Sequence, residues 1–328
     1  MPTALFYKAS WERLQDQISS IAPDLVIALL DEEGNITLNG EATTMEALQP
    51  EWFWIHSEMF FARKLKPYFE LMLACPSIRW LHTINTGLDG LPYLDLLERG
   101  VLLSNNHAQA VAIAEYVLGQ VLAHYQDPVE FRQNQLQGIW KPRGFREISG
   151  TNWLIVGFGE IGKGIARRVK AFDATLTAVR RKSDGEGLAD TVVQQDRLVE
   201  VLPQADVVVL ACASNAGTRN LVDAGFLAAM KDKAILVNIA RGDLVVEDAL
   251  RAALDAGKPE MAILDVFNQE PPAPQSWVWQ HPAVMLTPHC SNGGSGMRAR
   301  SDKNFLENLA RMTRGDALQN QVGRQDIL

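Results

Sequence analysis

Three polar side chains in the second half of the chain have the right chemistry to bind an anionic substrate and to transfer a proton to or from it. Arg241, Glu270 and His289 each follow a short apolar run by a few residues. An arginine can hold a carboxylate, a histidine with a near-neutral pKa can shuttle a proton, and a glutamate can raise that pKa by pairing. Taken singly, each is more often an ordinary surface residue. Their shared place after predicted strands favours a catalytic site.

A glycine-rich turn precedes these residues. The segment Gly157-Phe-Gly-Glu-Ile-Gly162 fits G-x-G-x-x-G, follows the apolar run 153–156 and leads into a segment with helical apolar spacing. Strand, turn and helix in that order form a dinucleotide fingerprint. Gly157 permits the tight turn, Gly159 lets the backbone approach a pyrophosphate, and Gly162 allows close packing of helix and strand. The helix N-terminus offers N–H groups to the phosphates.

The residues after the next apolar run indicate which dinucleotide is bound. NAD-selective sites usually carry Asp or Glu there, to accept a hydrogen bond from the ribose 2′-OH. Here the run 176–179 is followed by Arg180, Arg181, Lys182 and Ser183. Guanidinium groups bind phosphate oxygens in a bidentate fork, so this stretch suits a 2′-phosphate. We therefore predict a preference for NADP(H), with NAD(H) possible.

These residues need a scaffold of parallel strands. After Gly150, six short apolar runs occur, mostly separated by helical segments: 153–156, 176–179, 207–210, 235–237, 261–264 and 284–286. Apolar strands that alternate with helices predict a doubly wound parallel sheet covered on both faces. The first hundred residues predict a smaller β/α domain, with strands at 25–30, 78–84 and 101–103 and a helix at 91–99.

Three further segments connect these parts. Residues 108–125 predict a long helix packed against another helix or domain, and residues 297–315 predict an amphipathic helix. Between residues 126 and 150 the chain is polar and irregular, which is consistent with a partner surface, a lid or a solvated connection. The glycine-rich turn 292–296 predicts a hinge by which the chain returns to the first domain.

Composition excludes several classes of function. The chain has 328 residues, 47% of them hydrophobic, which predicts a folded protein of two domains. With 31 Lys and Arg against 39 Asp and Glu, the net charge is −8, so nucleic acid is not an expected partner. Scattered cysteines (Cys75, Cys212, Cys290) and histidines predict neither a disulfide framework nor a metal site. No signal peptide or membrane span is expected, and we expect a cytoplasmic protein.

Several motifs together resemble the D-isomer-specific 2-hydroxyacid dehydrogenase family. Residues 238–242, 264–267 with Glu270-Pro271, and 287–289 are similar to the three diagnostic blocks of that family. The basic stretch 180–183 and the segment 138–142 most resemble its glyoxylate/hydroxypyruvate reductase branch. The resemblance runs from about Ile84 to the C-terminal helix and is strongest between residues 150 and 291.

The resemblance implies a role for each candidate. Arg241 would bind the substrate carboxylate and polarise the keto oxygen, and protonated His289 would deliver the proton as hydride arrives. Glu270 would hold His289 protonated, and Asp265 would face the nicotinamide. The implied substrate-binding residues are Asn85, Thr86, Gly87, Arg241 and His289. The implied cofactor-binding residues are Gly157, Gly159, Glu160, Ile161, Gly162, Arg180, Arg181, Ser183, Ala211, Cys212, Ala213, Thr218, Ile239, Ala240, Arg241, Asp265, His289 and Ser291.

The resemblance also implies the architecture. A Rossmann NAD(P)-binding domain at residues 103–290 would be inserted into a flavodoxin-like substrate domain at residues 1–102 and 291–328, giving two doubly wound parallel-sheet α/β domains. Residues 108–150 would form a homodimer interface. In the first domain, where substrate side chains are largely read, Trp52, Phe53 and Trp54 could line a pocket, but core packing is favoured.

The expected function is NAD(P)H-dependent reduction of a small anionic 2-keto acid, such as glyoxylate or hydroxypyruvate, to a D-2-hydroxy acid, with His289 as general acid. Two alternatives stay open. One is a dinucleotide-sensing regulatory protein of the corepressor kind, which binds cofactor with little turnover. The other is a dehydrogenase for a larger 2-hydroxy acid, phosphorylated or aromatic.

Overall fold

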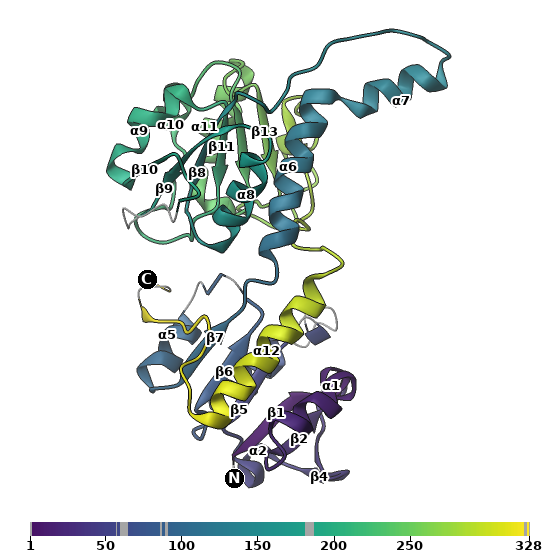
Figure 1. The fold of residues 1–328 in the computed structure, drawn as a ribbon, viewed down its shortest axis with the longest axis vertical. Coiled ribbons are helices and arrows are strands. Elements are labelled where there is room, and N and C mark those ends of the chain that lie inside the picture. Colours follow the sequence, from purple (N-terminus) through teal and green to yellow (C-terminus); the bar gives the residue numbers. More distant parts are fainter. Residues whose placement is uncertain are drawn as a thin grey trace. The chain divides into compact units, whose positions relative to one another are not determined.

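The computed structural model describes residues 2–56, 58–59, 65–85, 87–88, 91–180, 187–324 and 327. The chain forms two compact units (Figure 1). The first unit comprises Met1–Ala108 and Ser295–Leu328, and the second comprises Gln109–Gly294. The domain boundaries predicted from the sequence, after residues 102 and 290, lie a few residues before those in the structure. Strand β7 (Leu102–Asn105) explains the first difference, because it pairs along its length with β6 (Trp80–Thr83) of the first unit.

The first unit is built around a seven-stranded sheet in the order β4-β3-β2-β1-β5-β6-β7. Its five parallel strands, numbered along the chain, lie in the order 2-1-3-4-5, which is the flavodoxin-like arrangement. An antiparallel hairpin of β3 and β4 extends one edge. The other elements are β1 (Thr3–Tyr7), α1 (Lys8–Ile21), β2 (Val26–Leu30), β3 (Ile36–Leu38), β4 (Glu41–Thr43), α2 (Met45–Leu48), β5 (Trp52–Ile55), α4 (Leu65–Ala74), α5 (Leu91–Glu98) and α12 (Met297–Arg314).

The aromatic run in β5 belongs to the core of the first unit, as favoured. All four of its residues are buried. Trp54 stacks on Phe305 of α12 with ring centroids 3.8 Å apart, and Trp52 meets Trp80 edge-on at 5.5 Å. Strand β1 was not predicted from sequence, because its apolar run passes directly into α1 without the Gly, Pro or Asn that usually marks the end of a strand.

The second unit has a seven-stranded parallel sheet in the order β10-β9-β8-β11-β12-β13-β14. Numbered along this unit, the order is 3-2-1-4-5-6-7, which extends the Rossmann arrangement by one strand. Its elements are α6 (Ala110–Gln126), α7 (Pro128–Leu136), β8 (Asn152–Val156), α8 (Glu160–Lys170), β9 (Thr175–Val179), β10 (Thr191–Val193), η1 (Gln195–Arg197), α9 (Leu198–Val201), η2 (Leu202–Gln204), β11 (Val207–Leu210), α10 (Ala224–Ala229), β12 (Ile235–Asn238), η3 (Gly242–Leu244), α11 (Glu247–Asp255), β13 (Met261–Leu264), η4 (Trp277–Trp279) and β14 (Val284–Leu286).

Alternate residues of the central strands of this sheet enter two separate cores. Trp153 and Ile155 of β8 pack with α6 and α8 on one face, whereas Leu154 and Val156 pack with α9, α10 and α11 on the other. Because both faces are covered, the strands are apolar throughout, as the sequence predicts. The two doubly wound α/β domains predicted from sequence are confirmed.

The sequence predicts an irregular stretch at residues 126–150, but the structure has helix α7 there. Asp127 caps this helix by accepting a hydrogen bond from the backbone N–H of Glu130 at 3.1 Å, and Pro128 begins it. No residue of α7 is buried, so the apolar periodicity that reveals most helices is absent. Figure 1 shows α7 and the loop after it extending away from the sheet of the second unit.

Candidate functional site

Most of the predicted site residues lie at one edge of the sheet of the second unit. Strands β8, β11, β12, β13 and β14 run parallel in adjacent positions, so their carboxyl ends meet at the same edge. The glycine turn follows β8, Arg241 follows β12, Asp265 and Glu270 follow β13, and His289 follows β14. In doubly wound sheets, ligands bind at this edge and at the point where the strand order reverses, here between β8 and β11.

The glycine turn is shaped by contacts that no side chain would allow. Gly157 has φ +97°, and a Cβ there would lie 2.5 Å from the backbone nitrogen of Cys212. A Cβ on Gly162 would lie 2.5 Å from the carbonyl oxygen of Gly157. In contrast, a Cβ on Gly159 would meet no atom of the described chain within 4 Å. The protein itself therefore requires glycine at 157 and 162, while the space beside Gly159 is open to a ligand.

The loop after β11 lies against the glycine turn at Gly157 and contains the predicted residues Ala211, Cys212, Ala213 and Thr218. Thr218 closes the loop, since its hydroxyl donates to the carbonyl oxygen of Ala213 at 2.7 Å and accepts from the N–H of Asn215 at 2.9 Å. Burial raises the pKa of the Cys212 thiol to about 11. The thiol is thus neutral at physiological pH.

The predicted cofactor residues around the turn and after β9 are placed as follows. Glu160 begins α8 and pairs with Lys163 at 3.0 Å, with the neighbouring Ile161 packed against the core of α6 and α8. Arg180 follows β9 directly, and its backbone N–H donates to the carbonyl oxygen of Val193 at 3.1 Å. Arg181 and Ser183 lie outside the described residues.

The turn of Arg241 is organised by a buried asparagine. The amide of Asn238 donates to the carbonyl oxygen of Arg241 at 2.8 Å and accepts from the N–H of Ala240 at 3.1 Å. This folds residues Ile239 and Ala240 into a tight turn, and the Arg241 guanidinium donates to the carbonyl oxygen of Ala240 at 2.8 Å. Arg241 is half-buried in the segment that follows β12.

The side chains of His289 and Glu270 are in direct contact. The Nδ1 atom of His289 lies 2.7 Å from Oε2 of Glu270, and Oε1 of Glu270 accepts from the N–H of Phe267 at 3.0 Å. His289 has φ +49°, an unusual conformation for a residue with a side chain. With Nδ1 engaged by Glu270, Nε2 is the ring atom suited to exchange a proton with a substrate.

Asp265 makes its contacts within the protein. This fully buried carboxylate accepts from the hydroxyl of Thr287 at 2.6 Å and from the backbone N–H groups of Cys290 and Ser291 at 2.9 and 3.0 Å. The N–H of His289 donates to the carbonyl oxygen of Asp265 at 3.0 Å. Asp265 therefore holds the backbone of His289 and of the two residues that follow it.

Sequence reasoning missed Asp243, which links two loops of the site. Its carboxylate accepts from the hydroxyl of Ser214 at 2.8 Å and from Nε of Arg219 at 3.2 Å. Its carbonyl oxygen accepts from the N–H of Asn220 at 2.8 Å. The turn that carries Arg241 is thereby bound to the loop after β11. The only feature of the sequence that could have indicated Asp243 is its position two residues after Arg241.

The predicted substrate loop belongs to the first unit and follows β6. The amide of Asn85 donates to the hydroxyl of Tyr93 at 2.7 Å, and its backbone N–H donates to Thr83 at 3.2 Å. Gly87 is partly exposed, and Thr86 lies outside the described residues. Tyr93 was not identified from the sequence as a partner of this loop.

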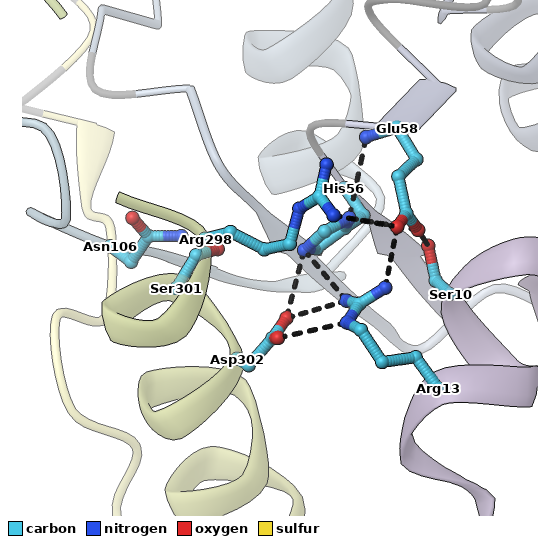
Figure 2. A network of polar contacts seen from close by, with 8 residues as sticks. All are labelled: Ser10, Arg13, His56, Glu58, Asn106, Arg298, Ser301 and Asp302. Carbon is cyan, nitrogen blue, oxygen red and sulfur yellow. Dashed lines mark hydrogen bonds and ion pairs between the residues drawn. The ribbon is translucent and has the colours of Figure 1, made fainter. Parts of the chain in front are cut away.

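The first unit contains a polar network that the sequence did not reveal (Figure 2). Arg13 of α1 binds both carboxylate oxygens of Asp302 on α12, at 2.8 and 3.1 Å, and Oε1 of Glu58 at 2.6 Å. Ser10 donates to the other oxygen of Glu58 at 2.7 Å. Nε2 of the fully buried His56 lies 2.9 Å from Asp302. The network joins α1, α12 and the segment after β5.

This network lies at the carboxyl edge of its sheet, at the reversal between β1 and β5. Burial would raise the pKa of Glu58, but hydrogen bonds from His56, Ser10 and Arg13 outweigh it and lower the pKa to about 2. Asp302 is likewise buried, yet contacts with His56 and Arg13 lower its pKa. Arg298 adds a cation 3.8 Å from Glu58. At this reversal the protein's own charged side chains thus pair with one another.

Two negative findings concern the described part of the chain. It contains no group of three or more His, Cys, Asp or Glu side chains arranged to hold a metal ion. None of its helices combines the length and apolar character that crossing a membrane requires.

A Rossmann-type sheet with a glycine-rich turn after its first strand and an Arg–Glu–His set at one edge is typical of a dinucleotide-dependent oxidoreductase. Residues 118–291, more than half of the chain, match the model for the D-isomer specific 2-hydroxyacid dehydrogenase, NAD binding domain. The chain belongs to the D-isomer specific 2-hydroxyacid dehydrogenase family, and the resemblance inferred from its motifs is confirmed. It is accordingly a D-2-hydroxyacid dehydrogenase, an oxidoreductase with an NAD-binding domain.

Individual relatives agree with this assignment. Over 268 residues, covering 82% of this chain and 83% of the relative, the sequence is 29% identical to glyoxylate/hydroxypyruvate reductase A of Klebsiella pneumoniae (strain 342). A solved structure of a family protein from Aeromonas salmonicida subsp. salmonicida A449 is 26% identical, with a TM-score of 0.78 and coverage of 98% and 99% of the two chains. The fold also matches an NADPH-dependent glyoxylate/hydroxypyruvate reductase from Sinorhizobium meliloti in complex with NADP and sulfate, at 20% identity, TM-score 0.75 and 99% coverage of each chain.

Proposed function

We propose that this protein uses NADPH to reduce a small 2-keto acid of the glyoxylate or hydroxypyruvate type to the D-2-hydroxy acid. The observation that carries the proposal is the 2.7 Å contact between His289 and Glu270 at the sheet edge that also bears Arg241 and the glycine turn. This arrangement supplies an acid, its orienting carboxylate and a cation for an anionic substrate. The reductase name of the Klebsiella pneumoniae relative supports the choice of substrate class.

The glycine turn fits a dinucleotide. Gly159 has extended backbone (φ −82°, ψ −163°) that any residue adopts, and no described atom lies where its Cβ would be. Neither conformation nor protein packing explains a glycine here, whereas close approach of a pyrophosphate does. Gly159 directly precedes α8, whose first N–H groups face this space and favour negative charge. Residues 157–162 would thus hold the phosphates.

The preference for NADPH rests on the end of β9. Arg180 stands where NAD-selective proteins place a carboxylate toward the ribose hydroxyls. A guanidinium there favours a 2′-phosphate, and a carboxylate would repel it. Arg181 and Ser183 would add a second cation and a hydroxyl, which remains a prediction from sequence. NAD(H) would bind less tightly because it lacks the 2′-phosphate that Arg180 would contact.

The chemistry then divides among the residues of this chain. When bound, NADPH supplies a hydride to the keto carbon. Arg241 would bind the substrate carboxylate and polarise the keto oxygen, so that the carbon becomes a better acceptor. His289 would donate the Nε2 proton to that oxygen as negative charge develops, while Glu270 holds the ring through Nδ1. Asp265 would keep the backbone of His289 in place, at the nicotinamide side of the edge.

The remaining parts of the proposal concern the first unit and assembly. The loop of Asn85, Thr86 and Gly87 would bind the substrate carboxylate through backbone N–H groups, making the first unit the substrate domain. The arm within residues 108–150 would form a homodimer. Its apolar side chains Leu136 and Trp140 are 71% and 95% exposed, more than an isolated domain normally shows. We place the enzyme in the cytoplasm.

Turnover measurements test the function. NADPH and NADH oxidation would be followed with glyoxylate, hydroxypyruvate, pyruvate and phenylpyruvate. His289→Ala should lower kcat by about 100-fold or more with an unchanged Kd for NADPH, because general-acid catalysis is lost but the cofactor site is not. His281→Ala is the matched control, since His281 also contacts a carboxylate (Asp255, 3.3 Å) but precedes β14 at the opposite edge. It should leave kcat unchanged.

The outcomes separate the alternatives. If NADPH binds tightly but no keto acid causes its oxidation, the proposal of a reductase is contradicted and a dinucleotide sensor is favoured. Turnover with phenylpyruvate alone would favour a larger substrate. Arg180→Ala should raise the KM for NADPH about tenfold, as expected for one lost charge-assisted contact, with little change for NADH. An unchanged NADPH to NADH ratio would contradict the cofactor preference.

A further inference from the structure

Three hydrogen-bonded side chains connect α6 to the turn that carries His289. The hydroxyl of Tyr116 on α6 lies 2.6 Å from Oγ1 of Thr287, which in turn donates to Oδ1 of Asp265 at 2.6 Å. The same carboxylate accepts from the N–H groups of Cys290 and Ser291. Tyr116, far from His289 in sequence, is therefore linked through Thr287 and Asp265 to the backbone that follows His289.

The direction of these hydrogen bonds follows from the number of protons. A threonine hydroxyl has one proton, and that of Thr287 is donated to Asp265. Thr287 can then only accept from Tyr116, so the tyrosine hydroxyl is the donor. Burial raises the pKa of Tyr116 to about 12. Tyr116 therefore keeps its proton throughout the physiological range.

The turn needs such support because its backbone conformation is unfavourable. His289 has φ +49°, and its N–H donates to the carbonyl oxygens of both Asp265 and Thr287 at 3.0 Å. A residue with a side chain persists in this conformation only where its surroundings hold it there. Here the surroundings are Asp265 and Thr287, and Tyr116 is the donor that orients the latter.

We propose that Tyr116 is a positioning residue for His289. Its hydroxyl orients Thr287, Thr287 and the two N–H groups orient the carboxylate of Asp265, and the left-handed turn aims the imidazole as a result. Tyr116 touches neither substrate nor cofactor in this scheme. The inference rests on the proposed function in one respect, namely that His289 is the acid of the reaction.

Removing the hydroxyl alone tests this link. Tyr116→Phe should lower kcat about tenfold, the cost of one lost buried hydrogen bond at a site that must hold its geometry, with an unchanged Kd for NADPH. Tyr125→Phe is the matched control. Tyr125 lies on the same helix, is buried, and its hydroxyl has no hydrogen-bond partner within the described chain. Its variant should keep the wild-type kcat, and an equal fall in both variants would overturn the proposal.

Thr287 provides a second, independent test. Thr287→Ser keeps the hydroxyl and should retain most activity, whereas Thr287→Val keeps the shape and should lower kcat. In the Thr287→Val background, Tyr116→Phe should cause no further loss, because the link is already broken. Losses that multiply would show that Tyr116 acts by another route and would overturn the proposal. The Thr287 pair remains informative if Tyr116→Phe does not fold.

A spectroscopic measurement separates this inference from the proposed function. The imidazole NMR signal of His289 would be assigned by its disappearance in His289→Gln. Tyr116→Phe should shift this signal and its pH titration, whereas Tyr125→Phe should not. An enzyme without turnover on any keto acid would defeat the proposed function and still allow this test. An unchanged His289 signal in Tyr116→Phe would overturn the positioning role, whatever the activity.

Discussion

Gly242 lies against the backbone of Phe267 so closely that a Cβ on Gly242 would collide with the carbonyl carbon of Phe267. Gly242 directly follows Arg241, and Phe267 donates its N–H to Glu270. The contact therefore joins the turn of the proposed carboxylate-binding arginine to the segment that orients the proposed acid. Asn268 continues this junction, since its N–H donates to Glu247 at 3.2 Å. Close approach of two backbones thus fixes the spacing between the segments of Arg241 and Glu270, to which we assign catalytic roles.

Gly242→Ala should disrupt this junction. A methyl group so close to backbone atoms forces the two segments apart, and a displacement of about 1 Å in catalytic geometry costs about 100-fold in rate. We expect kcat for the keto acid to fall by that order and the melting temperature to drop. A variant with wild-type kcat/KM would contradict the argument that this contact sets the geometry.

Gly159→Ala should behave in the opposite way. Because no described atom lies within 4 Å of its Cβ and its backbone is extended, alanine should leave the melting temperature unchanged. The methyl group would instead meet the cofactor phosphates, so the Kd for NADPH should rise by about tenfold or more, the cost of a displaced charge-assisted contact. Fluorescence titration and thermal unfolding measure the two effects separately.

Gly119→Ala serves as the control for this substitution. Gly119 is exposed on α6, and a Cβ there would also meet no atom within 4 Å. Alanine favours a helix over glycine by about 1 kcal/mol, so this variant should be slightly more stable and bind NADPH normally. If Gly159→Ala binds NADPH equally well, the assignment of the turn to the pyrophosphate is wrong.

The sequence predicts those parts of the protein that show a repeated apolar pattern or a known motif. Apolar runs separated by helical segments predicted the sheet of the second unit, and G-x-G-x-x-G after one such run located the turn at the reversal of strand order between β8 and β11. Helix α7 escaped detection because it buries no side chain. Strand β10, three residues at the sheet edge, is too short to show a pattern.

Contacts between distant residues could not be predicted in this way. Asp243, Tyr116 and Asp302 are ordinary residues of their segments until folding brings them to Ser214, Thr287 and Arg13. Arg13 and Asp302, for example, are separated by 289 positions, and no local spacing encodes their pairing. Motifs show where chemistry is placed, whereas the residues that hold it in place emerge only from the fold.

Asp243→Ala should lower kcat/KM because it loosens the loop after β11. The substitution removes the acceptor of Ser214 and Arg219 and so frees that loop from the turn of Arg241. Each of the two lost hydrogen bonds is worth about 1 kcal/mol, which together predict a fall of up to about 30-fold in kcat/KM. Asp243→Asn keeps an acceptor oxygen for Ser214 and should fall less. Identical kinetics for the alanine variant and the wild type would show that the two loops are not coupled.

The network around Glu58 makes stability depend on pH. The pKa of Glu58 is about 2 in the folded protein, below the value near 4.5 of a free glutamate, so folding favours its ionised form. Its stabilising contribution is complete above about pH 4.5 and is lost as the pH falls toward 2; a difference of this size corresponds to at most about 3 kcal/mol. Asp302, whose pKa is also lowered, acts in the same direction.

Glu58→Gln should reveal this contribution. Urea unfolding from pH 7 to pH 3 should give a free energy of unfolding that decreases toward acid pH more steeply in the wild type than in the variant. The difference between the two should be greatest at neutral pH, because only there is the Glu58 carboxylate fully ionised in both states. Glu12→Gln, in an exposed pair with Lys8 at 3.9 Å, should follow the wild-type curve closely. Parallel curves for Glu58→Gln and the wild type would mean that the Arg13–Glu58 contact does not stabilise the first unit.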